Sequence, residues 1–150
     1  CSGLVGSEMC IRDRAKTRLN VQAVTNRMPI EAGKIYICSL LTEIFCSSNS
    51  LEFKQAASDS QRFNPDIDQL FTSASKIGTD LSILGIILTG VGDDGALGCQ
   101  KLMDNGAQCI TESESTAVVY GMPMQAKNRV KNIEVQDLDQ IIQSIHTFGC

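Results

Sequence analysis

The chain has 150 residues, of which 43% are hydrophobic and 20% are charged, a composition typical of a globular protein. Its 13 basic and 17 acidic residues give a net charge of −4, and because the basic residues form no cluster we expect no nucleic-acid partner. No apolar run approaches the roughly 20 residues that a membrane span requires, so we expect a soluble protein without membrane insertion.

The chain contains seven cysteines, an odd number. Four of them stand in apolar strand or helix patterns: Cys38, Cys46, Cys99 and Cys109. They form no C-x-x-C pair and no histidine lies near them in the sequence, so the pattern does not indicate a zinc site. We therefore expect buried thiols of a cytoplasmic protein and no metal site.

The hydrophobic pattern predicts strands that alternate with helices. In chain order we expect strands at 34–38 and 42–46, a hairpin turn at Asn49-Ser50, a helix at 65–76, a strand at 83–88, a helix at 96–105, and a strand at 107–111. A helical turn at 115–120, a helix opened by Met122-Pro123, an edge strand within 130–135, and a helix at 137–147 with an Asp137/Gln140 capping box complete the pattern. This order predicts an α/β fold. We expect a mostly parallel sheet with helices on both faces, a Rossmann-like three-layer arrangement, and a small antiparallel hairpin.

An acidic, glycine-rich loop follows the apolar strand at 83–88, which reads as buried on both faces. Gly90 and Gly92 interrupt the apolar run, and Asp93-Asp94-Gly95 precede the next helix. In open α/β sheets, ligands bind just outside the carboxyl ends of the strands. This loop is therefore the first place to look for a functional site.

Two interpretations of the loop need no family. A carboxylate at a helix N-cap accepts backbone N–H bonds, and we favour that structural role for Asp93. Gly90, Gly92 and Gly95 also match the G-x-G-x-x-G dinucleotide fingerprint, with Glu112 at the end of the next strand. The two aspartates would oppose a pyrophosphate at the helix N-terminus, so this alternative is the weaker one.

A third interpretation comes from longer motifs. LTGVGDDGALG at 88–98 and NGAQCITESESTAVVYGMPMQA at 105–126 resemble the catalytic domain of the chemotaxis protein-glutamate methylesterases, the CheB family. GKIYIC at 33–38 and NPDIDQLF at 64–71 are similar to an upstream strand and helix start of that family. The resemblance spans about residues 15–145.

The resemblance implies a serine-hydrolase mechanism and assigns two residues to it. Asp94 corresponds to the aspartate of a Ser-His-Asp triad, and Val91 to the position whose backbone N–H helps to bind the oxyanion. Gly90, Gly92 and Gly95 shape the loop. The implied substrate is the glutamate methyl esters on the cytoplasmic helices of methyl-accepting chemoreceptors, and the implied activity extends to glutamine deamidation in some members.

The chain departs from the family at the other two triad positions. Its only histidine, His146, borders the apolar stripe of the predicted terminal helix, where we expect a packing or surface role. None of its serines stands in a glycine-flanked nucleophile turn, including Ser39, Ser47, Ser48, Ser113 and Ser115.

Residues 1–14 do not match the family and resemble translated adaptor sequence at the broken end of a reading frame. We therefore expect residues 15–150 to be the C-terminal part of a methylesterase catalytic domain, an incomplete domain that is inactive by itself. A dinucleotide-binding module and a catalytically dead, partner-binding domain remain the alternatives.

Overall fold

The computed structural model describes residues 18–48, 50–55, 66–77 and 81–148. The chain divides into two compact units, Cys1–Asp66 and Ile67–Cys150. The adaptor-like segment 1–14, Asn49 of the predicted hairpin turn, and residues 64–65 at the predicted helix start lie outside the described ranges.

The first unit consists of short strands in two sheets. β1 (Asn20–Ala23) pairs in parallel with β3 (Lys34–Ile37), and β5 (Ser50–Gln55) lies between β2 (Met28–Pro29) and β4 (Thr42–Ser47) in an antiparallel sheet. Val21, Val24 and Phe53 form its buried apolar core, and the ring of Tyr36 meets that of Phe53 edge-on at 5.0 Å. The β4–β5 pair is the predicted small antiparallel hairpin.

The second unit is built on a parallel sheet in the order β6-β7-β8. β6 (Leu84–Ile87), β7 (Gln108–Glu112) and β8 (Glu134–Gln136) are connected by helices, as parallel strands require. The first crossover is α3 (Ala96–Asp104) and the second is α4 (Gly121–Arg129). The carboxyl ends of all three strands therefore lie at one edge of this sheet.

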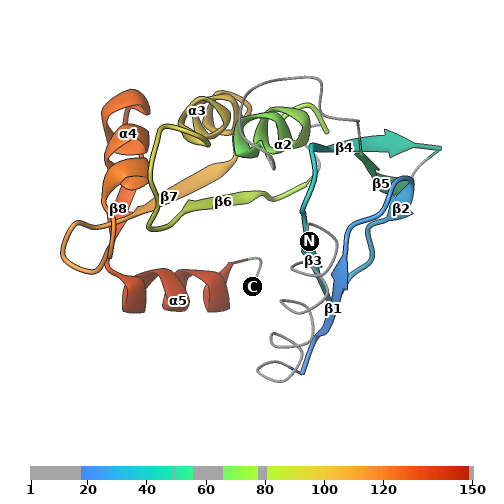
Figure 1. The fold of residues 1–150 in the computed structure, drawn as a ribbon, viewed down its shortest axis with the longest axis horizontal. Helices are drawn as coiled ribbons and strands as arrows, with labels where there is room; N and C mark the ends of the chain where they lie inside the picture. The colour runs from blue at the N-terminus through green and yellow to red at the C-terminus, as the bar shows by residue number, and fades with distance from the viewer. Residues whose placement is uncertain (1–17, 49, 56–65, 78–80, 149–150) are drawn as a thin grey trace, which may run out of the picture. The chain divides into compact units, whose positions relative to one another are not determined.

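Helices cover both faces of the parallel sheet, which makes the second unit a three-layer α/β structure (Figure 1). α2 (Ile67–Ala74) packs against α3 on one face, and α5 (Leu138–Thr147) lies on the opposite face. Leu102 of α3 and Ile87 of β6 are almost fully buried, as is Ile141 of α5. The predicted fold class is confirmed.

Most of the predicted elements are present, and the differences have local causes. β1 was not predicted, and β2 was missed because it has two residues and one of them is a proline on an edge strand. The predicted helical turn at 115–120 is wrong in extent, because a turn at 114–116 is followed by bends. The prediction that the first strand of the parallel sheet is buried on both faces is also wrong: Gly85 and Ile87 are buried, whereas Leu84 and Ile86 on the other face are half-buried.

The terminal helix follows its sequence signal closely. Asp137 is the N-cap of α5, and its backbone N–H donates to Oε1 of Gln140 at 2.9 Å, which completes the predicted capping box. No described helix is long and apolar enough to cross a membrane.

The cysteine prediction is only partly correct. Among the described residues, Cys99 and Cys109 are buried free thiols, whereas Cys38 is half-buried and Cys46 is exposed on β4. The hydrogen bond with Cys109, and then burial, raise the pKa of the Cys99 thiol, because both disfavour its thiolate.

Candidate active site at the carboxyl edge of the parallel sheet

The acidic loop occupies residues 88–95, between β6 and α3, at the carboxyl edge of the parallel sheet. Gly92 and Gly95 adopt positive φ angles of 101° and 89°, a conformation that L side chains rarely adopt. Gly90 is needed for a different reason, since a Cβ at this position would lie 2.3 Å from Sδ of Met122. The three glycines thus allow a tight loop to pass directly beside the start of α4.

A second segment, residues 119–122, holds the beginning of this loop. The Gly90 N–H donates to the Val119 carbonyl at 2.9 Å, and the Met122 N–H donates to the Gly90 carbonyl at 2.9 Å. Gly121 makes this approach possible, because a Cβ there would lie 2.7 Å from the Gly90 oxygen. The predicted 115–120 helical turn instead ends in a bridge between Tyr120 and Gly90.

The two N–H groups that follow Gly90 in the loop differ from the Gly90 N–H in their hydrogen bonding. Among the residues that the structure describes, neither the Val91 N–H nor the Gly92 N–H has a hydrogen-bond acceptor. Val91 is 79% exposed, and its N–H shares a planar peptide group with the Gly90 carbonyl, which the Met122 N–H holds. Backbone N–H groups that are held in place and have no acceptor in the protein can bind an oxyanion.

Asp94 is buried, with 8% of its surface exposed, and its carboxylate binds the start of α2. Its two oxygens accept hydrogen bonds from the backbone N–H groups of Ile67 and Asp68, each at 3.0 Å. In turn, Oδ1 of Asp68 accepts the N–H of Gly98 in the first turn of α3 at 2.6 Å. The two aspartates therefore cap each other's helices reciprocally, which fixes Asp94 rigidly.

The N-cap role that the sequence suggested for Asp93 is wrong. The N-cap residue of α3 is Gly95, and no side chain caps this helix from that position. Asp93 is exposed, and its carbonyl rather than its carboxylate accepts the Ala96 N–H at 3.3 Å. The Gly98 N–H in the first turn of α3 is instead bound by the carboxylate of Asp68 on α2. Asp68 lies too far along the chain for a local pattern to indicate this contact.

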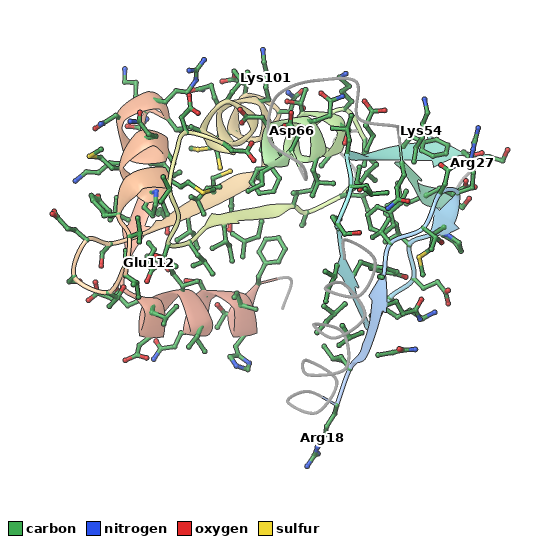
Figure 2. The ribbon with its side chains drawn as sticks, viewed as in Figure 1. Arg18, Arg27, Lys54, Asp66, Lys101 and Glu112 are labelled. Carbon is green, nitrogen blue, oxygen red and sulfur yellow. The ribbon has the colours of Figure 1, made fainter. Side chains whose placement is uncertain are left out.

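Glu112, at the end of β7, is a buried carboxylate with 3% of its surface exposed. Its Oε2 accepts the backbone N–H of Thr89 at 2.8 Å (Figure 2 labels Glu112). The sequence singled out Glu112 only as a possible ribose ligand, and it missed the contact to the loop. A charged residue at the end of a strand was the available signal.

The serines and the histidine present do not assemble a triad. The hydroxyls of Ser113 and Ser115 both donate to the carboxylate of Asp137, and their oxygens lie 2.7 Å apart. His146 is exposed near the other end of α5, about 13 Å along the helix axis from Asp137 at 1.5 Å per residue. The Ser113 and Ser115 hydroxyls therefore attach the 113–116 loop to the start of α5.

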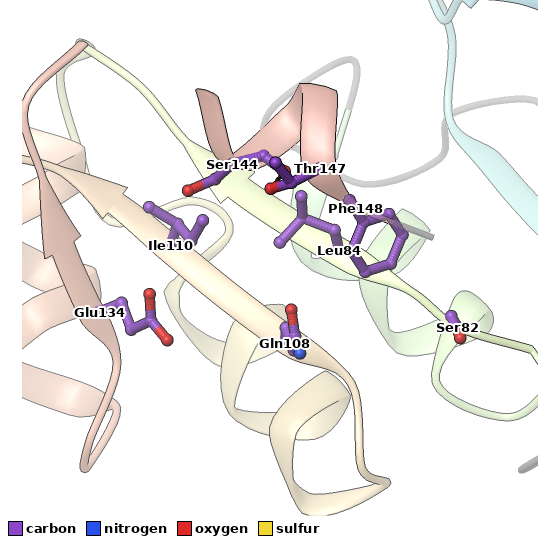
Figure 3. A pocket seen from close by; sticks show the side chains of 8 residues that line it. All are labelled: Ser82, Leu84, Gln108, Ile110, Glu134, Ser144, Thr147 and Phe148. Atoms are coloured by element: carbon purple, nitrogen blue, oxygen red, sulfur yellow. Dashed lines mark hydrogen bonds between the residues drawn. The ribbon is translucent and has the colours of Figure 1, made fainter. Parts of the chain in front are cut away.

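Figure 3 shows a pocket elsewhere in the second unit, with a volume of about 380 Å³. It lies against the sheet beside α5, and its lining includes Gln108, Glu134 and Ser144. Its residues include none from the 88–95 loop. Within the described ranges, no group of three or more His, Cys, Asp or Glu side chains could hold a metal ion.

The parallel sheet and the loop at its carboxyl edge place the chain among α/β domains with a candidate site at the carboxyl ends of the strands. The family model described as CheB methylesterase matches residues 6–145. The chain therefore belongs to the CheB methylesterase family, whose named members are carboxylic ester hydrolases.

Relatives and a solved structure agree with this assignment. The chain is 43% identical over 84 residues to protein-glutamate methylesterase/protein-glutamine glutaminase 2 of Chromobacterium violaceum, covering 56% of this chain and 23% of that protein. It is 40% identical over 84 residues to the corresponding Salmonella typhimurium protein, covering 56% and 24%. In both cases the match spans less than a quarter of the relative's own length.

The fold matches the crystal structure of the Thermotoga maritima CheB methylesterase catalytic domain. The TM-score is 0.83 at 23% sequence identity, and the match covers 93% of this chain and 75% of that domain. This similarity shows that the two chains share a fold.

Proposed function

We propose that the protein carrying this chain hydrolyses glutamate γ-methyl esters on the cytoplasmic helices of methyl-accepting chemoreceptors, and that it deamidates glutamine there. The names of the relatives support the esterase and glutaminase activities. In this proposal residues 15–150 are the C-terminal part of the catalytic domain, and the protein is cytoplasmic. The serine and histidine of the triad come from sequence that precedes residue 15.

The position of Asp94 is the observation on which the proposal depends. Its carboxylate is buried beside the loop and held by two backbone N–H groups from α2. Each carboxylate oxygen has a second lone pair, so Asp94 can accept a further hydrogen bond from an imidazole N–H. A fixed carboxylate sets the histidine tautomer and stabilises the imidazolium that forms during catalysis.

The proposed mechanism uses the loop donors in the next step. The serine oxygen attacks the ester carbonyl carbon while the histidine takes its proton, and the carbonyl oxygen becomes an oxyanion that accepts the Val91 N–H. Collapse of this intermediate expels methanol, which takes its proton from the histidine. Water then hydrolyses the acyl-enzyme, which returns the serine and leaves a glutamate carboxylate. The steps need no metal or organic cofactor.

The geometry gives no support to the dinucleotide alternative. The fingerprint would need Glu112 to bind ribose hydroxyls, but this carboxylate is buried and accepts the Thr89 N–H. It would also need an anion at the start of α3, where the buried Asp94 carboxylate directly precedes Gly95. Both observations favour the esterase proposal.

Methanol release from methyl-labelled receptor tests the proposal. In the protein extended upstream through its serine and histidine segments, Asp94→Asn should lower turnover by about 10³- to 10⁴-fold, as when a triad loses its orienting carboxylate. Asp93→Asn is the matched control, because this neighbour is exposed and should leave turnover unchanged. The chain without those segments should show no turnover.

Equal losses in the two variants would overturn the assignment of Asp94. Turnover by the isolated chain at the rate of the extended protein would overturn the proposed origin of the serine and histidine. An extended protein that folds but releases no methanol would overturn the proposed function.

A further inference from the structure

The buried carboxylate of Glu112 extends the pairing of β6 and β7 beyond the end of the strands. The backbone ladder runs from Leu84↔Gln108 to Ile87↔Thr111. The next residue of β7 is Glu112, and its side chain, not its backbone, accepts the Thr89 N–H at 2.8 Å. The carboxylate therefore ties the first part of the loop to β7 after β6 has ended.

Thr89 is also hydrogen-bonded to Val119, which lies just before α4. Its hydroxyl accepts the Val119 N–H at 2.7 Å and donates to the Val119 carbonyl at 3.2 Å. Gly90 is then fixed through both of its backbone polar groups, to Val119 and to Met122. The polar groups immediately before Val91 are thus held from two sides, while the N–H groups of Val91 and Gly92 have no acceptor among the described residues.

We infer that Glu112 is a positioning residue that, through Thr89, fixes the direction of the Val91 and Gly92 N–H groups toward the reacting carbonyl. The inference rests on the proposed esterase function. Glu112 is nearly inaccessible to solvent and would not touch the substrate. A peptide N–H that stabilises an oxyanion must be oriented before the reaction, because reorientation during the reaction would cost part of the stabilisation.

The expected signature is a loss in kcat with little change in KM. The loop donors act on the charge that develops in the transition state, so misdirecting them weakens transition-state binding more than substrate binding. Removal of one oxyanion donor costs about 10²- to 10³-fold in kcat. A displaced donor should cost less, so we expect a decrease of about 10- to 100-fold when Glu112 loses its acceptor.

Two substitutions separate hydrogen bonding from charge. Glu112→Gln keeps an oxygen that can accept the Thr89 N–H, whereas Glu112→Leu keeps most of the volume and removes every acceptor. In the extended protein, Glu112→Leu should show the loss in kcat, and Glu112→Gln should retain most of the wild-type kcat. Glu114→Leu is the matched control, because Glu114 is exposed two residues further along and should be neutral.

Amide hydrogen exchange, resolved to single residues in the same protein, provides a readout that does not depend on activity. The Thr89 amide should be protected in the wild type and in Glu112→Gln, and should exchange rapidly in Glu112→Leu. Thr89→Val with Thr89→Ser as its conservative partner serves as a second pair, because only serine keeps the hydroxyl link to Val119. This pair carries the test if Glu112→Leu does not fold.

The outcomes distinguish this inference from the proposed function. A wild-type protein that folds, protects the Thr89 amide and hydrolyses no ester would overturn the proposed function and, with it, the catalytic purpose assigned to Glu112. An active protein in which Glu112→Leu or Thr89→Val keeps the wild-type kcat would overturn the inference alone. Equal losses in Glu112→Gln and Glu112→Leu would also overturn it, because the effect would then follow from charge.

Discussion

Replacing Asp94 should destabilise α2 as well as impair catalysis, and the size of that effect follows from its contacts. The carboxylate accepts two backbone N–H groups at 3.0 Å, from Ile67 and Asp68. Hydrogen bonds to charged groups contribute about 1.5–3 kcal/mol each, whereas an exposed N-cap contributes about 0.5–2 kcal/mol in total. Asp94 is buried but its two partners are half-buried, so water replaces the lost acceptor incompletely. We therefore expect Asp94→Ala to lower the free energy of unfolding by about 2–4 kcal/mol.

Urea unfolding followed by far-ultraviolet circular dichroism measures this change on the chain itself. Asp94→Asn keeps one acceptor oxygen and presents an amide N–H₂ to the second donor, so it should cost about 1–2 kcal/mol. Asp93→Ala is the control, and since its side chain is exposed it should change stability by less than about 0.5 kcal/mol.

The reasoning fails if Asp94→Ala unfolds within about 0.5 kcal/mol of the wild type, or if Asp93→Ala costs as much. Either result would mean that the reciprocal caps of α2 and α3 do not stabilise the unit. The turnover of Asp94→Asn must be compared with that of the wild type at a temperature at which both proteins are folded. The measured loss in the free energy of unfolding shows which temperatures meet that condition.

Two further predictions concern the rest of the second unit. The hydroxyls of Ser113 and then Ser115 lower the pKa of Asp137 below its ordinary value of 3.8, so their stabilising contribution should be fully present above that pH and be lost as the pH falls through the lowered pKa. Asp137→Ala should remove this part of the acid dependence of the thermal midpoint, and an unchanged pH profile would contradict the assignment. In the folded chain, iodoacetamide should modify the exposed Cys46 rapidly and leave the buried Cys99 unmodified, as judged by peptide mass spectrometry. Equal labelling of the two thiols before unfolding would contradict the burial of Cys99.

The sequence alone was sufficient for most of the elements and for the family. The apolar run at 83–88, the glycine-bounded helix after it and the Asp137/Gln140 capping box are signals carried by residues within one or two turns of each other. The motifs at 88–98 and 105–126 identified the CheB methylesterases, and the family match and the fold agree. Local patterns were informative because helix ends, turns and buried strands depend mainly on neighbouring residues.

The sequence could not say what the carboxylates of the loop bind. The sequence suggested Asp93 as a helix N-cap. In the structure Asp94 caps α2 by accepting the Ile67 N–H, 27 residues away, and Asp68 caps α3 by accepting the Gly98 N–H, 30 residues away. The sequence also did not predict that Glu112 binds Thr89, 23 residues away, or that Thr89 binds Val119, 30 residues away. These contacts exist because parallel strands bring separate crossovers to one edge of the sheet, where each buried polar group must find a partner from another segment. No local pattern encodes that choice, because it is made by tertiary packing.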